Sequence, residues 1–273
     1  MHTLEASGNY LEAERSLDAY IAIVENEKKT LSSKHSSNSN HPISEDIVQD
    51  VDSDEEILLT MAAGIRLLVK FRNDGKRAMA IAQKMESSAK SWNITDPKVL
   101  GTVYHAVGVT NSLWSIQSMS CFMFWHLLQA LEPDSRQSIQ SAAVTAYTTA
   151  LSHTPNNLNT HYQLALQHAW QRNLDTSISS LSQALHINKS HVPSIHLLAL
   201  VLTALEDYEK ALQTCHTLKF DHIEHLDIDG TVALMEMQLT YLRIVEAVCG
   251  RDLALEDINK DISNEPNCSI RKN

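Results

Sequence analysis

The fold is decided by two neighbouring stretches: residues 161–189 read HYQLALQHAWQRNLDTSISSLSQALHINK, and residues 195–219 read IHLLALVLTALEDYEKALQTCHTLK. Laid one on the other, they coincide at six pairs of positions that lie 34 residues apart: Ala165/Ala199, Leu164/Leu198, Leu174/Tyr208, Ser177/Ala211, Leu181/Cys215 and Ala184/Leu218. Small residues at fixed positions let two helices approach closely. The two stretches therefore predict a chain of stacked helical pairs.

The same period continues toward the N-terminus. A step of 34 residues back from Ala184 reaches Ala150, and the same step from Lys189 reaches Pro155, where a proline after a second helix is expected. A 34-residue period of this kind is typical of the tetratricopeptide repeat. The sequence predicts an all-α fold, a tetratricopeptide-repeat α-solenoid of antiparallel helical hairpins, and the pattern is clearest over residues 135–218.

The remaining segments are assigned from this repeat. Residues 1–31 resemble the second half of a repeat and predict the second helix of a truncated unit. Residues 57–250 are predicted to form the solenoid, whose last helix stops at Gly250, as helices often do. Residues 251–273 have no apolar period and are predicted to be a disordered tail.

A polar segment interrupts the helical pattern. Residues 32–56 read SSKHSSNSNHPISEDIVQDVDSDEE, which is rich in serine and asparagine and then in acidic residues. Such a segment buries too little apolar surface to offset the entropy of ordering. It is predicted to be a disordered acidic loop, in which Ser44 and Ser53 are candidate phosphorylation sites and a solvated spacer is the commoner interpretation.

Composition excludes several classes of protein. Seven glycines and six prolines among 273 residues are less than half of the roughly 12% found in average sequences, which argues against barrels and sandwiches. The formal net charge of −11, with no local basic patch, disfavours nucleic acid and anionic lipid as direct partners. No apolar stretch reaches the ~20 residues of a membrane-spanning helix. We therefore expect a cytoplasmic protein without direct membrane insertion.

Motifs that carry chemistry are absent. The sequence contains no GxxxxGK[ST], GxGxxG, GxSxG or HExxH pattern, so we expect no enzyme activity and no cofactor. The four cysteines have no zinc-ligand spacing and are expected to be reduced thiols. Fourteen histidines raise the possibility of a metal site, but no carboxylate-flanked pair accompanies them. His161 and His168 are interpreted as packed or half-buried side chains.

Several stretches carry a more specific resemblance. They are LALQHA at 164–169, SIHLLALVLTA at 194–204 and YEKAL at 208–212, with YHAVGV at 104–109 and MQLTYL at 237–242. Over about 95–250 the chain resembles the tetratricopeptide repeat protein seven family, whose fungal members are cargo-transport or filamentation proteins. The resemblance implies a scaffold that links a phosphatidylinositol 4-kinase to a lipid-anchored recruiter at the plasma membrane, with a hyccin-like subunit in animals and a role in endocytic transport in fungi.

The candidate partner-binding residues come from the repeat geometry. The first helix of each hairpin lines the concave side of this fold, and the positions predicted to face that groove share an apolar or aromatic character. The predicted binding residues are Tyr162, Leu166, Trp170, His196, Leu200 and Thr203. None is basic, so an amphipathic helix is a better ligand than an acidic peptide. For the residues, packing against a neighbouring helix remains an alternative. For the function, two alternatives remain: a generic repeat adaptor in chaperone or ubiquitin-ligase traffic, and a cryptic hydrolase whose nucleophile–base pair the sequence does not place.

Overall fold

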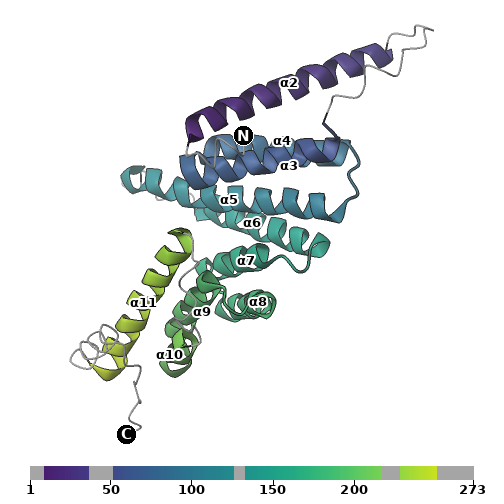
Figure 1. Cartoon of the computed structure of the whole chain (residues 1–273). Helices are drawn as coiled ribbons and strands as arrows, with labels where there is room; N and C mark the ends of the chain where they lie inside the picture. Colours follow the sequence, from purple (N-terminus) through teal and green to yellow (C-terminus); the bar gives the residue numbers. More distant parts are fainter. Residues whose placement is uncertain (1–8, 37–51, 126–132, 217–227, 251–273) are drawn as a thin grey trace. The chain divides into compact units, whose positions relative to one another are not determined.

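The computed structural model describes residues 9–36, 52–125, 133–216 and 228–250, and every regular element in these residues is a helix (Figure 1). The predicted all-α class with tetratricopeptide-type helical hairpins is confirmed. The chain forms two compact units, unit 1 with residues 1–155 and unit 2 with residues 156–273. None of the described helices is long and apolar enough to cross a membrane.

Unit 1 contains α2, α3, a short π-helix η2, and α4 to α6. In it α5 packs against α3, α4 and α6. The bounds are α2 Tyr10–Ser36, α3 Asp54–Leu67, η2 Leu68–Arg72, α4 Gly75–Ser91, α5 Pro97–Trp125 and α6 Pro133–His153. The α5/α6 pair crosses at Gly108, where the Tyr147 ring packs so closely that an added Cβ would lie 2.6 Å from it. The buried Tyr147 hydroxyl lies 3.0 Å from Ser112 Oγ, so this large polar side chain is satisfied inside the crossing.

Unit 2 contains the two repeats that the sequence identified, followed by one further helix. The bounds are α7 Leu158–Trp170, α8 Leu174–Ile187, α9 Val192–Ala204, α10 Tyr208–His216 and α11 Ile228–Cys249. Ala165 and Ala199 are both completely buried, as the 34-residue period predicts. The buried Ser177 Oγ of α8 donates a hydrogen bond to the Ala165 carbonyl of α7 at 2.9 Å. The small residues therefore bring the helices of the hairpin into direct contact.

The turns between the paired helices also repeat. Arg172 and Glu206 lie 34 residues apart and both adopt a left-handed backbone, with φ values of 60° and 61°. Their backbone N–H groups donate to Ala169 and Thr203, which are again 34 residues apart. A left-handed conformation is costly for residues other than glycine, so the surrounding helices must hold it. The sequence did not reveal this conformation because neither residue is glycine.

The predicted boundaries of the acidic loop are wrong at both ends. Helix α2 continues to Ser36, and α3 begins at Asp54. Ser53 caps α3: its side chain accepts a hydrogen bond from Glu56 N, and Glu56 reaches back to Ser53 N. The acidic residues that suggested disorder complete this capping box and favour the positive end of the helix dipole. The rest of the predicted loop, residues 37–51, and the predicted tail at 251–273 lie outside the described residues.

Helix α2 docks on unit 1 by a steric fit and a stacked ring pair. Leu17 of α2 is buried directly over Gly64 of α3, where an added Cβ would lie 2.4 Å from Leu17 Cδ2. Tyr10 stacks on Phe71 of η2 with ring centroids 4.1 Å apart. The Tyr20 hydroxyl donates to Asp52 Oδ2 at 2.6 Å, which holds α2 beside the residue that precedes the α3 cap. Contacts with α3, with η2 and with Asp52 before the α3 cap therefore fix this helix.

Ion pairs add to the α2 contact. Glu14 is largely buried and pairs with Arg77 and, at 2.9 Å, with Arg72 Nε, while Asp18 receives a second bond from Arg77 at 2.6 Å. Arg72 ends η2 and Arg77 lies in the first turn of α4. One basic residue at the end of η2 and one in the first turn of α4 are therefore engaged with α2.

Replacing Ala199 by Arg should destabilise unit 2 by about 3 kcal/mol or more, because the hairpin crossing has no room for the side chain and no partner for its charge. The matched control is Ala204→Arg, at an exposed position on the same helix. Thermal unfolding followed by circular dichroism should show a large fall in melting temperature for the first variant and a small change for the second. Equal melting curves would contradict the assigned repeat phase.

Gly64→Ala should destabilise unit 1 by about 1 to 3 kcal/mol through overpacking against Leu17, although the same change in an open helix stabilises. Urea unfolding would measure the effect. Leu17→Ala removes the obstructing side chain, so in that background Gly64→Ala should no longer destabilise. An identical effect of Gly64→Ala in both backgrounds would show that Leu17 does not pack on this glycine.

Candidate protein-binding face

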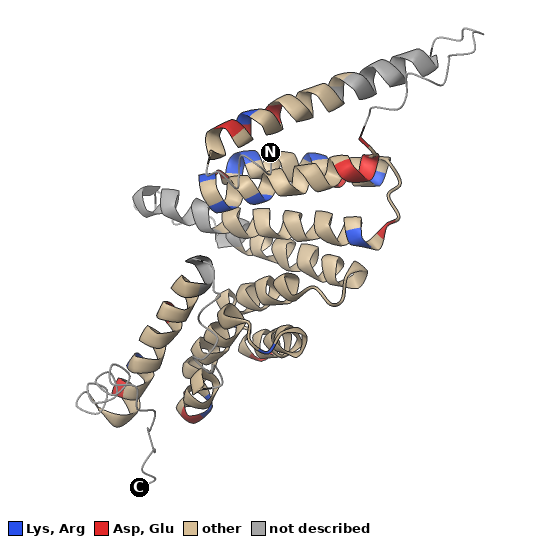
Figure 2. Cartoon of the chain, in the orientation of Figure 1, with Lys and Arg blue, Asp and Glu red and all other residues tan. Residues whose placement is uncertain are grey.

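The candidate site lies on the first helices of the repeats of unit 2: α7, α9 and the further helix α11. We call the side of these helices that carries Tyr162 of α7 and His196 of α9 the A-helix face. Helices α7 and α9 contain no Asp, Glu, Lys or Arg, and Figure 2 shows both ribbons without charged residues. This face is therefore neutral along two consecutive repeats.

Helices α9 and α11 run in the same direction. Val192 and Ile195, near the start of α9, share a buried cluster with Leu234 and Met237 of α11. Leu202, near the end of α9, shares another with Ile244 and Val245. Contacts between the two helices therefore span more than 34 residues, as in the 44-residue separation of His196 and Thr240, because residues 217–227 separate α10 from α11.

Tyr162 and His196 provide the polar groups of the face. The Tyr162 ring makes an edge contact with His191 at a centroid distance of 5.6 Å. Burial raises the pKa of Tyr162, and the negative charge of Glu236 raises it further. His196 Nε2 lies 2.9 Å from Thr240 Oγ1 of α11. Burial lowers the pKa of His196 while Glu236 opposes the shift, so the imidazole is neutral at pH 7.

Two of the predicted residues serve the helices themselves. Leu166 is half-buried and packs against the cluster formed by Ala165, Leu181, Leu197 and Val201. Thr203 Oγ1 donates to the Ala199 carbonyl at 2.8 Å. For these positions the structure supplies an internal packing or hydrogen-bonding role, and a role in partner binding stays a prediction.

Trp170 and Leu200 are different, because both are large apolar side chains that remain exposed. Trp170 ends α7 and is 38% exposed, and Leu200 of α9 is 43% exposed. They come from neighbouring helices of two consecutive repeats. Exposed aromatic and aliphatic side chains on a neutral surface are typical of protein interaction sites. Binding through this pair stays a prediction.

The sequence missed the contribution of α11. Thr240 and Glu236 lie one turn apart on this helix and face His196, as the Thr240 contact and the effect of Glu236 on the His196 pKa indicate. Val232, Met235 and Leu239 of the same helix are exposed apolar side chains. A step of 34 residues from His196 reaches position 230, not these residues. Only the change in spacing after α10 could have indicated them.

Other chemistry is limited to ordinary roles. Among the residues with described placement, no three His, Cys, Asp or Glu side chains are grouped to hold a metal ion. His161 and His168 are half-buried, as their repeat positions suggested. Burial raises the pKa of the Cys215 thiol to about 11, which keeps it protonated and unreactive.

Comparisons with known proteins support the assignment of the repeats. Residues 14–262 match the YPP1 middle domain. Tetratricopeptide repeat protein 7B of Mus musculus and of Homo sapiens are each 27% identical over 166 residues, which is 57% of this chain and 20% of each relative. The matched region thus spans about a fifth of the length of these relatives.

Similar solved structures include BtubC from P. vanneervenii, with a TM-score of 0.48 and 14% identity over 81% of this chain and 86% of that chain. The TPR2AB domain of yeast Sti1 in complex with pHSP90 has a TM-score of 0.37 and 14% identity over 88% of this chain and 81% of that chain. Both scores lie below 0.5, and the family assignment does not depend on them. Because the YPP1 middle domain matches 249 consecutive residues of this chain, the chain belongs to the YPP1 and tetratricopeptide repeat protein 7 family.

Proposed function

We propose that this chain is part of a non-catalytic scaffold that links a phosphatidylinositol 4-kinase to its plasma-membrane recruiter. Membership of the YPP1 family and the helical repeats support a role in protein interaction. The kinase, the recruiter and a hyccin-like subunit as partners follow from the family resemblance, as does a role in endocytic transport. Recruitment from the cytoplasm to the plasma membrane by such a partner is part of the same proposal.

One observation carries the binding site of this proposal. Trp170 and Leu200 place two large exposed apolar side chains on adjacent helices that carry no charged residue. Desolvating such a surface costs little, because no charged group must be removed from water. A partner helix with an apolar face gains the burial of both side chains, and aromatic residues of this kind are frequent binding hot spots.

The double variant Trp170→Ala and Leu200→Ala should weaken binding to at least one partner by about 2 kcal/mol, roughly thirtyfold. Affinity capture from cells followed by quantitative mass spectrometry would measure the loss. A suitable control is Ile187→Ala with Leu205→Ala, which removes two side chains of similar exposure, 39% and 44%, at the ends of α8 and α9.

The two variants separate the possible outcomes. If the wild type and the Trp170→Ala, Leu200→Ala double variant recover the kinase assembly equally, this face is excluded as the binding site for that assembly. Capture of a chaperone or ubiquitin-ligase assembly without the kinase would contradict the proposed function and favour a general repeat adaptor. Loss of binding in the control variant would place the interface elsewhere on unit 2.

The purified chain should bind anionic vesicles negligibly at physiological ionic strength. Its net charge of −11 repels anionic headgroups, and the surface field of the lipid decays within about 8 Å under these conditions. Sedimentation with phosphatidylserine vesicles would test this, with neutral phosphatidylcholine vesicles as the control. Strong, salt-sensitive binding to the anionic vesicles alone would show direct lipid contact rather than recruitment by a partner.

A further inference from the structure

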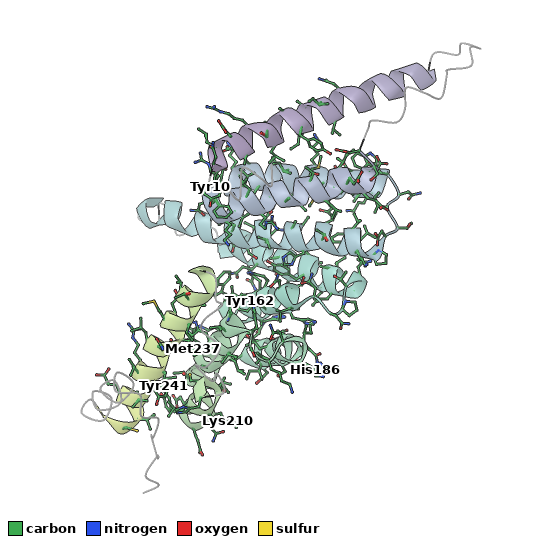
Figure 3. The ribbon with its side chains drawn as sticks, viewed as in Figure 1. Tyr10, Tyr162, His186, Lys210, Met237 and Tyr241 are labelled. Carbon is green, nitrogen blue, oxygen red and sulfur yellow. The ribbon has the colours of Figure 1, made fainter. Side chains whose placement is uncertain are left out.

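Glu236 places a carboxylate beside the neutral A-helix face. It is exposed, and it lies one turn before Thr240, whose side chain contacts His196 of α9. Its charge also acts on Tyr162 of α7, so it influences side chains of both α7 and α9; Figure 3 labels Tyr162 and Met237, the residue that follows Glu236. Among the described residues, no basic side chain forms an ion pair with Glu236, and its side chain accepts no hydrogen bond from them.

The groups around this carboxylate are neutral donors and acceptors. The Tyr162 hydroxyl stays protonated because burial and Glu236 both raise its pKa. His196 is uncharged at pH 7 and already engaged with Thr240. Among the α11 side chains that the structure places, the other charged groups are Arg243, two turns further on, and Glu246, and both are exposed. The face therefore has one acidic end, which an incoming positive charge would complement.

Glu236 and the exposed apolar side chains lie at different levels along the helix axes. Tyr162, His196 and Glu236 belong to the N-terminal halves of α7, α9 and α11, whereas Trp170 and Leu200 lie in the C-terminal halves. Eight residues separate Tyr162 from Trp170, which corresponds to about 12 Å along a helix. Leu200 lies four residues, about one turn, beyond His196, so a ligand lying along the face would meet the apolar pair about one to two helical turns from Glu236.

We propose that the A-helix face binds an amphipathic helix of a protein partner that places an arginine or lysine against Glu236 and large apolar side chains against Trp170 and Leu200. The proposal rests on the proposed function only in requiring a protein partner. Charge complementarity favours a basic residue in the partner. Glu236 would repel an acidic residue of the partner, and α7 and α9 contain no basic side chain that could bind that acidic residue. An amphipathic helix supplies both groups on one side, at spacings of three or four and of seven or eight residues.

The probe is a display library of helical peptides that is randomised along one face and selected against the whole immobilised chain. Enriched peptides should carry Arg or Lys with large apolar residues three or four and seven or eight positions away on the same side. Their affinity should fall about tenfold with Glu236→Gln and less than twofold with Glu246→Gln. Glu246 is the matched control, because it is an exposed acidic residue on the same helix and its change alters the net charge equally.

A charge reversal tests the pairing directly. Replacing the basic residue of an enriched peptide by Glu should abolish binding to the wild-type chain, and Glu236→Arg should restore part of it. Absence of enrichment, enrichment without a basic residue, or equal losses for the two glutamine variants would overturn the proposal.

The proposed function can fail separately from this inference. If wild-type chain captures the kinase assembly and the peptides show no basic preference, the helix ligand is wrong and the scaffold role stands. If basic peptides bind through Glu236 and no kinase assembly is captured, the ligand class is correct and the assigned assembly is wrong.

Discussion

The close approach of paired helices at small side chains is the constraint on which the rest of unit 2 depends. Ala165 and Ala199 have no exposed surface, and Ser177 reaches across the crossing to bond the Ala165 carbonyl. A larger side chain at either alanine would separate the helices and remove contacts along both. The positions of Trp170 and Leu200 follow from this contact, because each is carried on a helix whose rotation the buried alanine fixes.

The structure was most predictable from sequence where this close contact between paired helices recurs. Repeated small residues identified the hairpins of unit 2, since a 34-residue spacing survives only where the same crossing recurs. The turns at Arg172 and Glu206 repeat too, but their left-handed backbone is enforced by the flanking helices and leaves no glycine in the sequence. The start of α3 was missed because an acidic run has two meanings: it solvates a loop, or it caps a helix when a serine precedes it, as Ser53 does.

The site was predictable only in part, for a related reason. Positions on α7 and α9 could be transferred between repeats by counting, which located Tyr162 and His196 on one side of the molecule. Counting could not separate Leu166, which packs inward, from Leu200, which is exposed, because equivalent positions in two repeats have different neighbours. It could not locate Glu236 either, since the longer connection after α10 moves α11 out of the 34-residue register.

The docking of α2 has a consequence for the segment that joins it to α3. Leu17 seated over Gly64, together with the stacked rings of Tyr10 and Phe71, makes α2 comparable to a ligand tethered to its own receptor. For such a tethered ligand the free energy of docking depends only logarithmically on tether length, and each doubling of the tether costs about 0.6 kcal/mol. The connecting segment can therefore lengthen, shorten or change composition among homologues with little loss of docking, whereas drift at Leu17 or Gly64 is far more costly.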